Sequence, residues 1–267
     1  MTASTAPNEE PLELEWLGGA PEARLRRRRP GIDALPWVTL EVGALGEAAV
    51  FEARRVWTQG AFTEYASAAG FSCMAGLFLE CRAPVDLTAA AADCAVDELD
   101  HVELVARLLM ELGGASPFVA DFAALAPSTT PGERPIVRAA EIALKVSCVG
   151  EALSVPVLAS AHAAAATPLV RAVLRRLLRD EGAHARVGAW FFEWASERLT
   201  PGEREHLGRV AEATIAAYAP LMSATPCATC HLPAALGGAP ANAAVLRAAL
   251  DHRVIPGLRR AGIVVRS

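Results

Sequence analysis

Aromatic residues are scarce in this sequence. Phe, Trp and Tyr make up 6% of its 267 residues, whereas hydrophobic residues together make up 53%. Ala, Leu and Val supply most of the apolar content, and Gly and Pro fall mostly between the periodic apolar stretches. Small aliphatic side chains at helical spacing allow helices to pack closely. We therefore expect an all-α protein, and a chain of this length can bury a sizeable core in one domain.

The sequence also lacks long apolar runs and a strong excess of basic residues. No uncharged apolar stretch of about 18 residues occurs, and no apolar segment near the start precedes a cleavage site. The net charge is −5, which argues against a nucleic-acid partner. We expect a cytoplasmic protein with neither a membrane nor a nucleic acid as its partner.

Cysteine is too sparse for a disulfide framework. Four of the six cysteines lie within helical patterns, where reduced thiols act as small hydrophobic residues: Cys73, Cys81, Cys94 and Cys148. The other two belong to "CATCH", in which Cys227, Cys230 and His231 resemble a haem attachment signal or part of a zinc site. Haem attachment requires export and a structural zinc requires a fourth ligand, so we favour a simple loop.

Turn residues divide the chain into four long predicted helices: about 44–81, 87–112, 135–163 and 168–199. Pro135 and Pro168 suit first helical positions, Asp86 and Thr167 suit N-caps, and Pro156 predicts a kink. The stretch 114–134 is too long for a tight turn and suits a crossover connection. Two helical hairpins joined by a long crossover form one kind of four-helix bundle.

Three regions follow from this division. We expect residues 1–33 to form a flexible or loosely docked arm, because they are polar and charged. We favour exposure of the basic run "RLRRRR" at Arg24–Arg29 to solvent over its docking on an acidic partner. Residues 34–220 would form the bundle and a following helix, which starts at the capping box "TPGE", 200–203. Residues 221–267 would form a C-terminal loop and a helix near 240–252 that packs on the bundle.

Only six histidines occur, yet one His-containing motif appears twice, as "DELDH" at 97–101 and "DEGAH" at 180–184. Chance predicts on the order of 0.015 occurrences of Asp-Glu-x-x-His in a chain of this composition. On a helix, residues three apart lie on one face, so Glu and His of each motif can share a metal ion. Both faces are otherwise apolar. Burying these charges without compensation would cost several kcal/mol, which predicts a metal.

Two further acids stand alone in apolar helical stripes. Glu64 lies in "FTEYAS" and Glu151 in "CVGEAL". When each hairpin folds, Glu64 comes opposite Glu98 and Glu151 opposite Glu181, because each pair lies about 22 Å from its turn at 1.5 Å per residue. Four carboxylates and two divalent ions would balance in charge. The sequence thus predicts a two-metal site inside the bundle.

The segment from about 44 to 199 resembles the ferritin-like di-iron carboxylate superfamily. The stretches "EYASAAGF", "DELDHVEL", "CVGEAL" and "DEGAHARVGAW" look most like those of bacterial stand-alone ferritin-like domain proteins. One Glu from each of two helices and Glu-x-x-His from each of the other two is the known ligand pattern of that superfamily. The resemblance implies two iron ions, with manganese or a mixed Mn/Fe pair as alternatives.

The resemblance also implies a role for each residue. The implied ligands are the terminal Glu64 and Glu151, the bridging Glu98 and Glu181, and the nitrogen ligands His101 and His184. Asp97 and Asp180 would each accept a hydrogen bond from the His of the opposite motif, which orients the ring. Cys94 and Cys148 precede ligands by one turn and either line the metal pocket or simply fill the core.

The resemblance leaves more than one activity open. One is a di-iron oxidase or oxygenase that activates O2 and oxidises a small organic substrate. The alternative is a ferroxidase, an iron-handling protein or a rubrerythrin-like protein that removes peroxide. Leu177 replaces the extra His of arylamine N-oxygenases, and Val105 replaces the radical Tyr of ribonucleotide reductase subunits. A non-catalytic helical interaction module, in which metal is absent or inert, is a third possibility.

The partners follow from what the sequence lacks. It contains no flavin or dinucleotide fingerprint and no iron–sulfur cysteine set, so electrons would come from a separate reductase or ferredoxin, or from the substrate. A homodimer is compatible with the sequence.

Gly150 and Gly182 stand beside predicted ligands and either admit O2 or substrate, or permit close helix packing. A third Glu-x-x-His, at Glu203 and His206, lacks the preceding Asp, so we assign Glu203 to the capping box.

Overall fold

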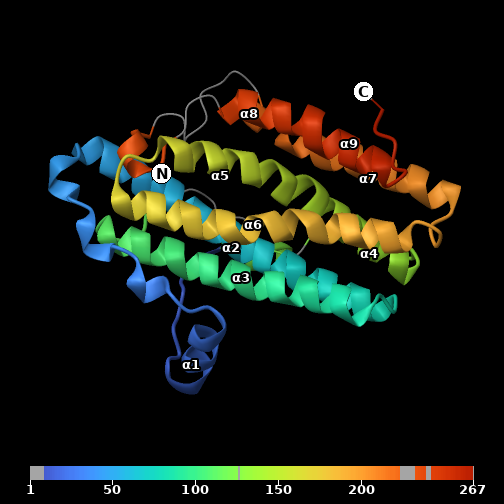
Figure 1. Ribbon diagram of the computed structural model, residues 1–267, viewed down its shortest axis with the longest axis horizontal. Helices are drawn as coiled ribbons and strands as arrows, with labels where there is room; N and C mark the ends of the chain where they lie inside the picture. Colours follow the sequence, from blue (N-terminus) through green and yellow to red (C-terminus); the bar gives the residue numbers. More distant parts are fainter. Residues whose placement is uncertain (1–8, 126, 223–231, 239–241, 267) are drawn as a thin grey trace.

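A computed structural model describes residues 9–125, 127–222, 232–238 and 242–266 (Figure 1). The chain is mostly helical, with 76% helix and 2% strand, and its helices pack together. The helical class predicted from the small aliphatic side chains is therefore confirmed. The "CATCH" segment, with Cys227, Cys230 and His231, lies outside the described residues.

Four long helical segments run side by side in Figure 1. They are α2 (Glu47–Glu80), α3 (Val85–Glu111), the continuous run of α4 (Pro135–Ala143), η5 (Leu144–Glu151) and α5 (Ala152–Ala164), and α6 (Pro168–Ala195). α2 packs against α3 and α4, α3 packs against α6, and η5 and α5 pack against α6. Each segment therefore contacts its hairpin partner and a member of the other hairpin.

The ends of these helices follow the turn residues of the sequence. Pro135 and Pro168 open α4 and α6 as predicted. At the start of the next helix, the Thr200 N–H donates to Glu203 Oε2 at 2.7 Å and the Glu203 N–H donates to Thr200 Oγ1 at 3.3 Å, which confirms the capping box. Thr167 does not cap α6 through its side chain. Its hydroxyl instead donates to the Ala235 carbonyl at 2.9 Å.

The third long segment differs from the expected kinked α-helix. Leu144–Glu151 is π-helical, and it ends on a predicted ligand, while Pro156 lies further on, inside α5. A π turn takes more residues than an α turn, and such turns are frequent at functional sites. A constant helical period fails across this segment, because the wider turn changes which face the following residues occupy.

The apolar core consists of two clusters that lie on either side of the two Glu-x-x-His motifs along the helices. One contains Phe71, Phe78, Leu87, Val187 and Phe191, and the Phe78 and Phe191 rings stack at 4.7 Å between centroids. The other contains Leu104, Leu108, Leu169, Val173 and Leu177. The polar residues between them are thus enclosed at both ends by side chains that exclude water.

The C-terminal helices cover one side of the bundle. They are α7 (Pro201–Met222), α8 (Asn242–Ala249), the π-helical η8 (Leu250–Val254) and α9 (Ile255–Arg260). α7 packs on α4 and η5, and α8 packs on α5 and α7, on the face away from α1 in Figure 1. The helix predicted near 240–252 is present and continues through η8 into α9.

The N-terminal region differs from the flexible form of the expected arm. Glu9–Pro11 forms a short strand, β1, that pairs antiparallel with β2 (Val119–Asp121) in the crossover. Gly19–Arg28 forms the helix α1, which Figure 1 shows below α3 and which contacts α3 through Arg26 and Arg28. Backbone pairing and charge contacts hold residues 9–33 on the bundle, so the docked alternative describes them better than a flexible arm. The two strands are also a small departure from an all-α protein.

The basic run is held by acids on α3. Arg26 pairs with Glu103, and the Arg29 guanidinium lies 3.0 Å from Asp93 and also pairs with Asp97. Only Arg24 and Arg27 in this run are exposed without an ion pair among the described residues. A run of like charges does not show its partners in the sequence, because these acids lie more than sixty residues away along the chain.

One helical run of the described chain, Pro135–Ala164, is long and apolar enough to cross a membrane by length and composition. The core helix of a soluble protein passes the same test. Here the run packs against α2 and α6 and carries the buried acids Glu141 and Glu151. Its apolar character therefore has an explanation in the packing of the bundle.

Gly188 sets how closely α6 approaches η5. A Cβ at this position would lie 2.5 Å from Cys148 Sγ and 2.9 Å from the Ala143 carbonyl oxygen. We expect Gly188→Ala to lower the free energy of unfolding by ~1–3 kcal/mol through overpacking. Gly182→Ala on the same helix, with only the Arg186 guanidinium 3.8 Å away, should be neutral or stabilising by up to ~1 kcal/mol. Urea denaturation measures both, and equal effects would contradict this account.

The capping box makes a second prediction, which depends on pH. Arg134 and then Thr200 lower the pKa of Glu203 from 4.5 to about 2, so the charged acid stabilises the fold above pH 4.5 and loses that effect as the pH falls toward 2. Glu203→Ala should cost ~1 kcal/mol at pH 7, with the difference from wild type shrinking below pH 4.5. Thermal unfolding from pH 7 to pH 3 measures it. The exposed Glu197→Ala serves as control, and a difference that stays constant over this range would refute the assignment.

Candidate metal centre

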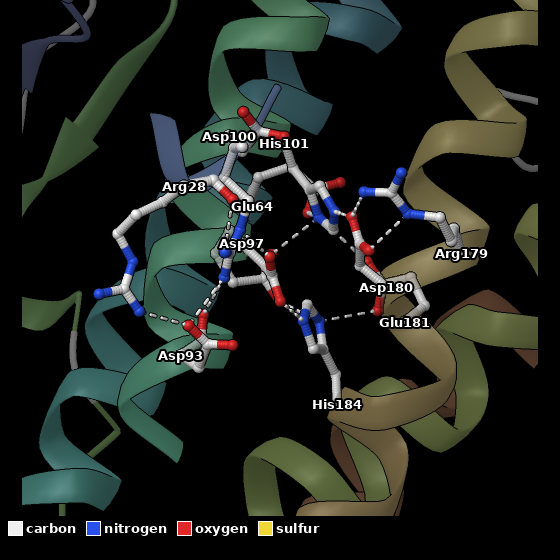
Figure 2. A network of polar contacts seen from close by, with 12 residues as sticks. Arg28, Glu64, Asp93, Asp97, Asp100, His101, Arg179, Asp180, Glu181 and His184 are labelled. Carbon is white, nitrogen blue, oxygen red and sulfur yellow. Dashed lines mark hydrogen bonds and ion pairs between the residues drawn. The ribbon is translucent and has the colours of Figure 1, made fainter. Parts of the chain in front are cut away.

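The two repeated motifs meet in the middle of the bundle. Glu98 and His101 project from α3, and Glu181 and His184 project from α6, and all four are at most 1% exposed. Each offers one ligand atom, and these four atoms lie within 4.8 Å of one another. Figure 2 shows the two imidazoles and the carboxylate of Glu181 turned toward a common centre. A buried group of this composition can hold a metal ion.

Each histidine turns its Nδ1 toward the carboxylates. His101 Nδ1 lies 3.5 Å from Glu64 Oε2, 3.4 Å from Glu98 Oε2 and 3.4 Å from Glu181 Oε1. His184 Nδ1 lies 2.8 Å from Glu98 Oε1 and 3.4 Å from Glu181 Oε2. Glu98 and Glu181 therefore place one oxygen near each imidazole, which is the arrangement that a carboxylate shared between two ions requires.

Glu64 and Glu151 complete the group from the other two helical segments. Glu64 on α2 lies beside His101, as given above. Glu151, the last residue of η5, lies close enough to Glu181 and His184 for their charges to interact. The Ser67 hydroxyl donates to Glu151 Oε1 at 3.3 Å. The structure thus brings together all six predicted side chains, with Glu64 on the His101 side and Glu151 on the His184 side.

Several polar atoms of this group are left without hydrogen bonds. Both carboxylate oxygens of Glu98, Glu181 Oε2, both ring nitrogens of His101 and His184 Nδ1 are buried and have no hydrogen-bond partner among the described residues. The 2.8 Å approach of His184 Nδ1 to Glu98 is not aligned for one. Buried polar atoms are almost always paired, and nitrogen and oxygen atoms directed at one centre are what a transition metal binds. These residues therefore fit a metal site.

Burial and mutual repulsion determine the protonation of the metal-free group. Burial raises the pKa of Glu64 to about 8 and raises the pKa of Glu151 well above its ordinary 4.5. Burial also favours neutral Glu98 and Glu181, but their contacts with the two histidines outweigh it and lower their pKa. Burial disfavours charged His101, yet the surrounding carboxylates raise its pKa overall. The group therefore needs positive charge at its centre, from protons or from metal ions.

The outer nitrogen of each histidine faces an aspartate of the opposite motif. His184 Nε2 lies 3.5 Å from Asp97 Oδ2, and His101 Nε2 lies 3.5 Å from Asp180 Oδ2. These distances are at the outer limit of a hydrogen bond, and Figure 2 draws both contacts. The pairing is the one that the resemblance implies. A carboxylate in this position fixes the orientation of the imidazole and makes it a better ligand.

Arginines hold these aspartates, and the sequence analysis did not identify them. Arg29 pairs with Asp97 from outside the bundle. Arg176 Nη1 donates to Asp180 Oδ2 at 2.9 Å, and its Nη2 donates to Asp100 Oδ2 at 2.6 Å. The four-residue spacing from Arg176 to Asp180 is a sequence signal for a helical ion pair. Arg29 has no comparable signal, since its contact depends on how the N-terminal region docks.

The predicted pocket cysteines have different surroundings. Cys94 is buried beside His184, whereas Cys148 packs against Gly188. Neither lines the cavity described below. Burial raises the pKa of both thiols, to about 12 for Cys148, so neither is a ready thiolate ligand or nucleophile. They fit the simpler alternative of small core residues.

A cavity of about 420 Å³ reaches the group from the side of α2, α5 and α7. Glu64 and Glu151 form part of its wall, and most of the remaining wall is apolar: Val56, Trp57, Val105, Leu153, Val157, Leu158, Ala161, Leu174, Leu177, Leu221, Leu232 and Leu246. A small molecule in this space would lie against the two carboxylates that belong to separate sides of the metal group.

The structure separates the roles of the two glycines next to predicted ligands. A Cβ at Gly150 would lie 3.2 Å from the Lys145 carbonyl oxygen and 3.3 Å from the Tyr218 hydroxyl, so this glycine makes room for Tyr218. A Cβ at Gly182 would approach only the end of the Arg186 side chain. Gly150 thus permits a close approach of α7 to η5, and Gly182 has no packing role of this kind.

The third Glu-x-x-His does not form a metal group. Glu203 serves the capping box, and His206 Nε2 lies 2.5 Å from Glu141 Oε1. The Thr130 N–H donates to the other oxygen of Glu141 at 2.7 Å. Each oxygen of this buried acid thus has a partner, in contrast to Glu98. The pattern Glu-x-x-His alone therefore does not predict the site, whereas the form with a preceding Asp does.

Known proteins offer no closer guide to this arrangement. No protein-family model, no curated protein and no solved structure matches the chain. The functional assignment therefore depends on the geometry and chemistry of the buried group itself.

The arginine contacts lead to a prediction about metal affinity. Arg29→Ala leaves Asp97 without its cationic partner, so His184 is held less firmly and the affinity for Mn²⁺ should fall by ~10-fold. Competition with a chelator measures the affinity, and hydrogen exchange over Gly19–Arg28 reports whether α1 stays docked. Arg27→Ala, which removes an exposed arginine from the same run, is the matched control. Identical affinities for both variants would show that Arg29 does not act on the site.

Proposed function

We propose that this chain is a ferritin-like di-iron protein that uses O2 to oxidise a small organic molecule. The observation that carries the proposal is the buried Glu and His group, several of whose ligand atoms have no hydrogen-bond partner among the described residues, together with the cavity that reaches it. The arrangement of α2 with α3 and of α5 with α6, joined through the long 112–134 connection, supports the ferritin-like assignment.

The donor set favours two ions. Glu98 and Glu181 would bridge them, Glu64 and His101 would complete one site, and Glu151 and His184 the other. Four carboxylates neutralise two divalent cations, which makes the occupied group tolerable inside an apolar core. Carboxylate and imidazole ligands suit both iron and manganese, and bound ferrous ions would supply the electrons for O2 reduction.

The protein's own residues would have three tasks in this reaction. Asp97 and Asp180 orient the imidazoles, and Arg29 and Arg176 hold those aspartates. The two apolar clusters that flank the group exclude water from it. The cavity binds the organic molecule against Glu64 and Glu151. We also propose a separate reductase or ferredoxin as the electron donor, in the cytoplasm.

The cavity favours an oxidase or oxygenase over an iron-handling or peroxide-removing protein. Iron and hydrogen peroxide need only a narrow path, whereas this space of about 420 Å³ falls within the range of small-molecule sites, roughly 300–1,000 Å³. Its mostly apolar wall would stabilise a carbon-containing substrate and would offer little to a hydrated metal ion.

The test is anaerobic loading with ferrous iron followed by exposure to O2. We expect about two irons per chain by elemental analysis, a rise in melting temperature on loading, and rapid O2 uptake at an oxygen electrode. Glu98→Ala should bind less than half of this iron, because it removes the ligand that both sides share. Glu203→Ala changes the equivalent acid of the third Glu-x-x-His and should load normally.

Two results would overturn this proposal. Normal iron binding by Glu98→Ala would remove the ligand assignment. Retention of many irons per chain after O2 exposure would instead indicate storage, which is the ferroxidase or iron-handling alternative.

A further inference from the structure

The cavity beside Glu64 and Glu151 has an unusual charge composition. Apart from these two acids, its polar wall residues are neutral. They are Gln59, Thr63, Ser67, Ser154 and Tyr218. Among the described residues that line it, none is a lysine, an arginine or a histidine. In the metal-free chain, a carboxylate or phosphate that entered this space would therefore lose its hydration without gaining a cationic side chain as a partner, and it would lie next to two acids. Burying an anion on such terms is strongly unfavourable.

The polar side chains of the cavity are not spread evenly around the metal group. Ser67 already donates to Glu151, and Tyr218 reaches the same end, because its hydroxyl lies against Gly150. The Tyr218 hydroxyl has no hydrogen-bond partner among the residues that the structure describes. A tyrosine phenol is protonated at neutral pH, so its hydroxyl can donate a hydrogen bond. One free donor therefore lies beside a predicted metal ligand, and an apolar wall extends away from it.

We infer that this cavity binds a neutral, largely apolar molecule with one hydrogen-bonding group, and that the Tyr218 hydroxyl holds that group beside Glu151. The inference deepens the proposed function and rests on it only in treating Glu64 and Glu151 as metal ligands. Tyr218 is then a specificity-determining residue that selects the end of the molecule presented to the metal side. Gly150 leaves room for the phenol, because a side chain there would make the Tyr218 hydroxyl shift by a few tenths of an ångström.

A matched series of fluorescent naphthalenes tests the charge preference: 1-naphthalenemethanol, 1-methylnaphthalene and 1-naphthoate. Their binding is measured by fluorescence titration with the full chain, both metal-free and loaded with Mn²⁺. The alcohol should bind in both states, and in the metal-free chain the naphthoate should bind more weakly than the alcohol by roughly tenfold or more. Equal or tighter binding of the naphthoate by the metal-free chain would overturn the inference.

Variants place the binding in this cavity and on Tyr218. Leu158→Trp adds volume to the wall, away from the ligands, and should abolish binding of the alcohol, whereas Val38→Trp adds the same ring at a site that is 92% exposed and should not. Tyr218→Phe keeps the ring and removes the hydroxyl. This substitution should lower the affinity for the alcohol by roughly 2- to 10-fold and leave the affinity for methylnaphthalene unchanged.

These measurements separate the two proposals. Circular dichroism checks that each variant is folded. If Leu158→Trp does not fold, the test depends on whether Tyr218→Phe weakens binding of the alcohol and leaves binding of methylnaphthalene unchanged. Two results would overturn the inference even if metal loading is normal. One is that Tyr218→Phe weakens the binding of both probes equally, and the other is that a folded Leu158→Trp variant binds the alcohol as the wild type does. Selective probe binding by a chain that takes up no metal would uphold the cavity and refute the proposed function instead.

Discussion

The constraint on which this structure depends is the cost of placing carboxylates and imidazoles in an apolar interior. Glu98, His101, Glu181 and His184 lie between two clusters of aliphatic and aromatic side chains and have almost no contact with water. Apolar residues such as leucine at these positions would usually give a fold of equal or greater stability. Their presence, with ligand atoms directed at one another, is understandable if positive charge is bound among them.

That constraint extends outward through successive layers. The imidazoles face Asp97 and Asp180, and these aspartates face Arg29 and Arg176. Opposite charges alternate from the centre to the surface, so each layer compensates the one inside it. The docking of the N-terminal region on α3 belongs to this scheme, because its Arg29 supplies the outermost charge on one side. The basic run thus has a structural purpose that its composition alone does not show.

Much of the helical arrangement and of the central group was accessible from the sequence, for identifiable reasons. Proline and glycine marked the helix ends, and the Asp-Glu-x-x-His repeats, with Glu64 and Glu151 at matching heights, indicated which side chains would meet. Such features depend on local periodicity. The docking of residues 9–33, the role of Tyr218 and the position of the cavity depend on contacts between distant segments, for which a single sequence carries no signal.

The π-helical segment has a consequence for how the chain tolerates change. Ala139, Ala140 and Ala143 precede it as fully buried residues, and Glu151 ends it at the buried Glu and His group. A π turn holds about one residue more than an α turn, so loss of one residue in between would restore a regular α turn with both sides still facing as they do now. Loss of a second residue would rotate the carboxylate by about 100° relative to the alanines. Either the alanines would then leave the core or the carboxylate would move away from its neighbours. This stretch of the bundle therefore tolerates the loss of one residue but not of two.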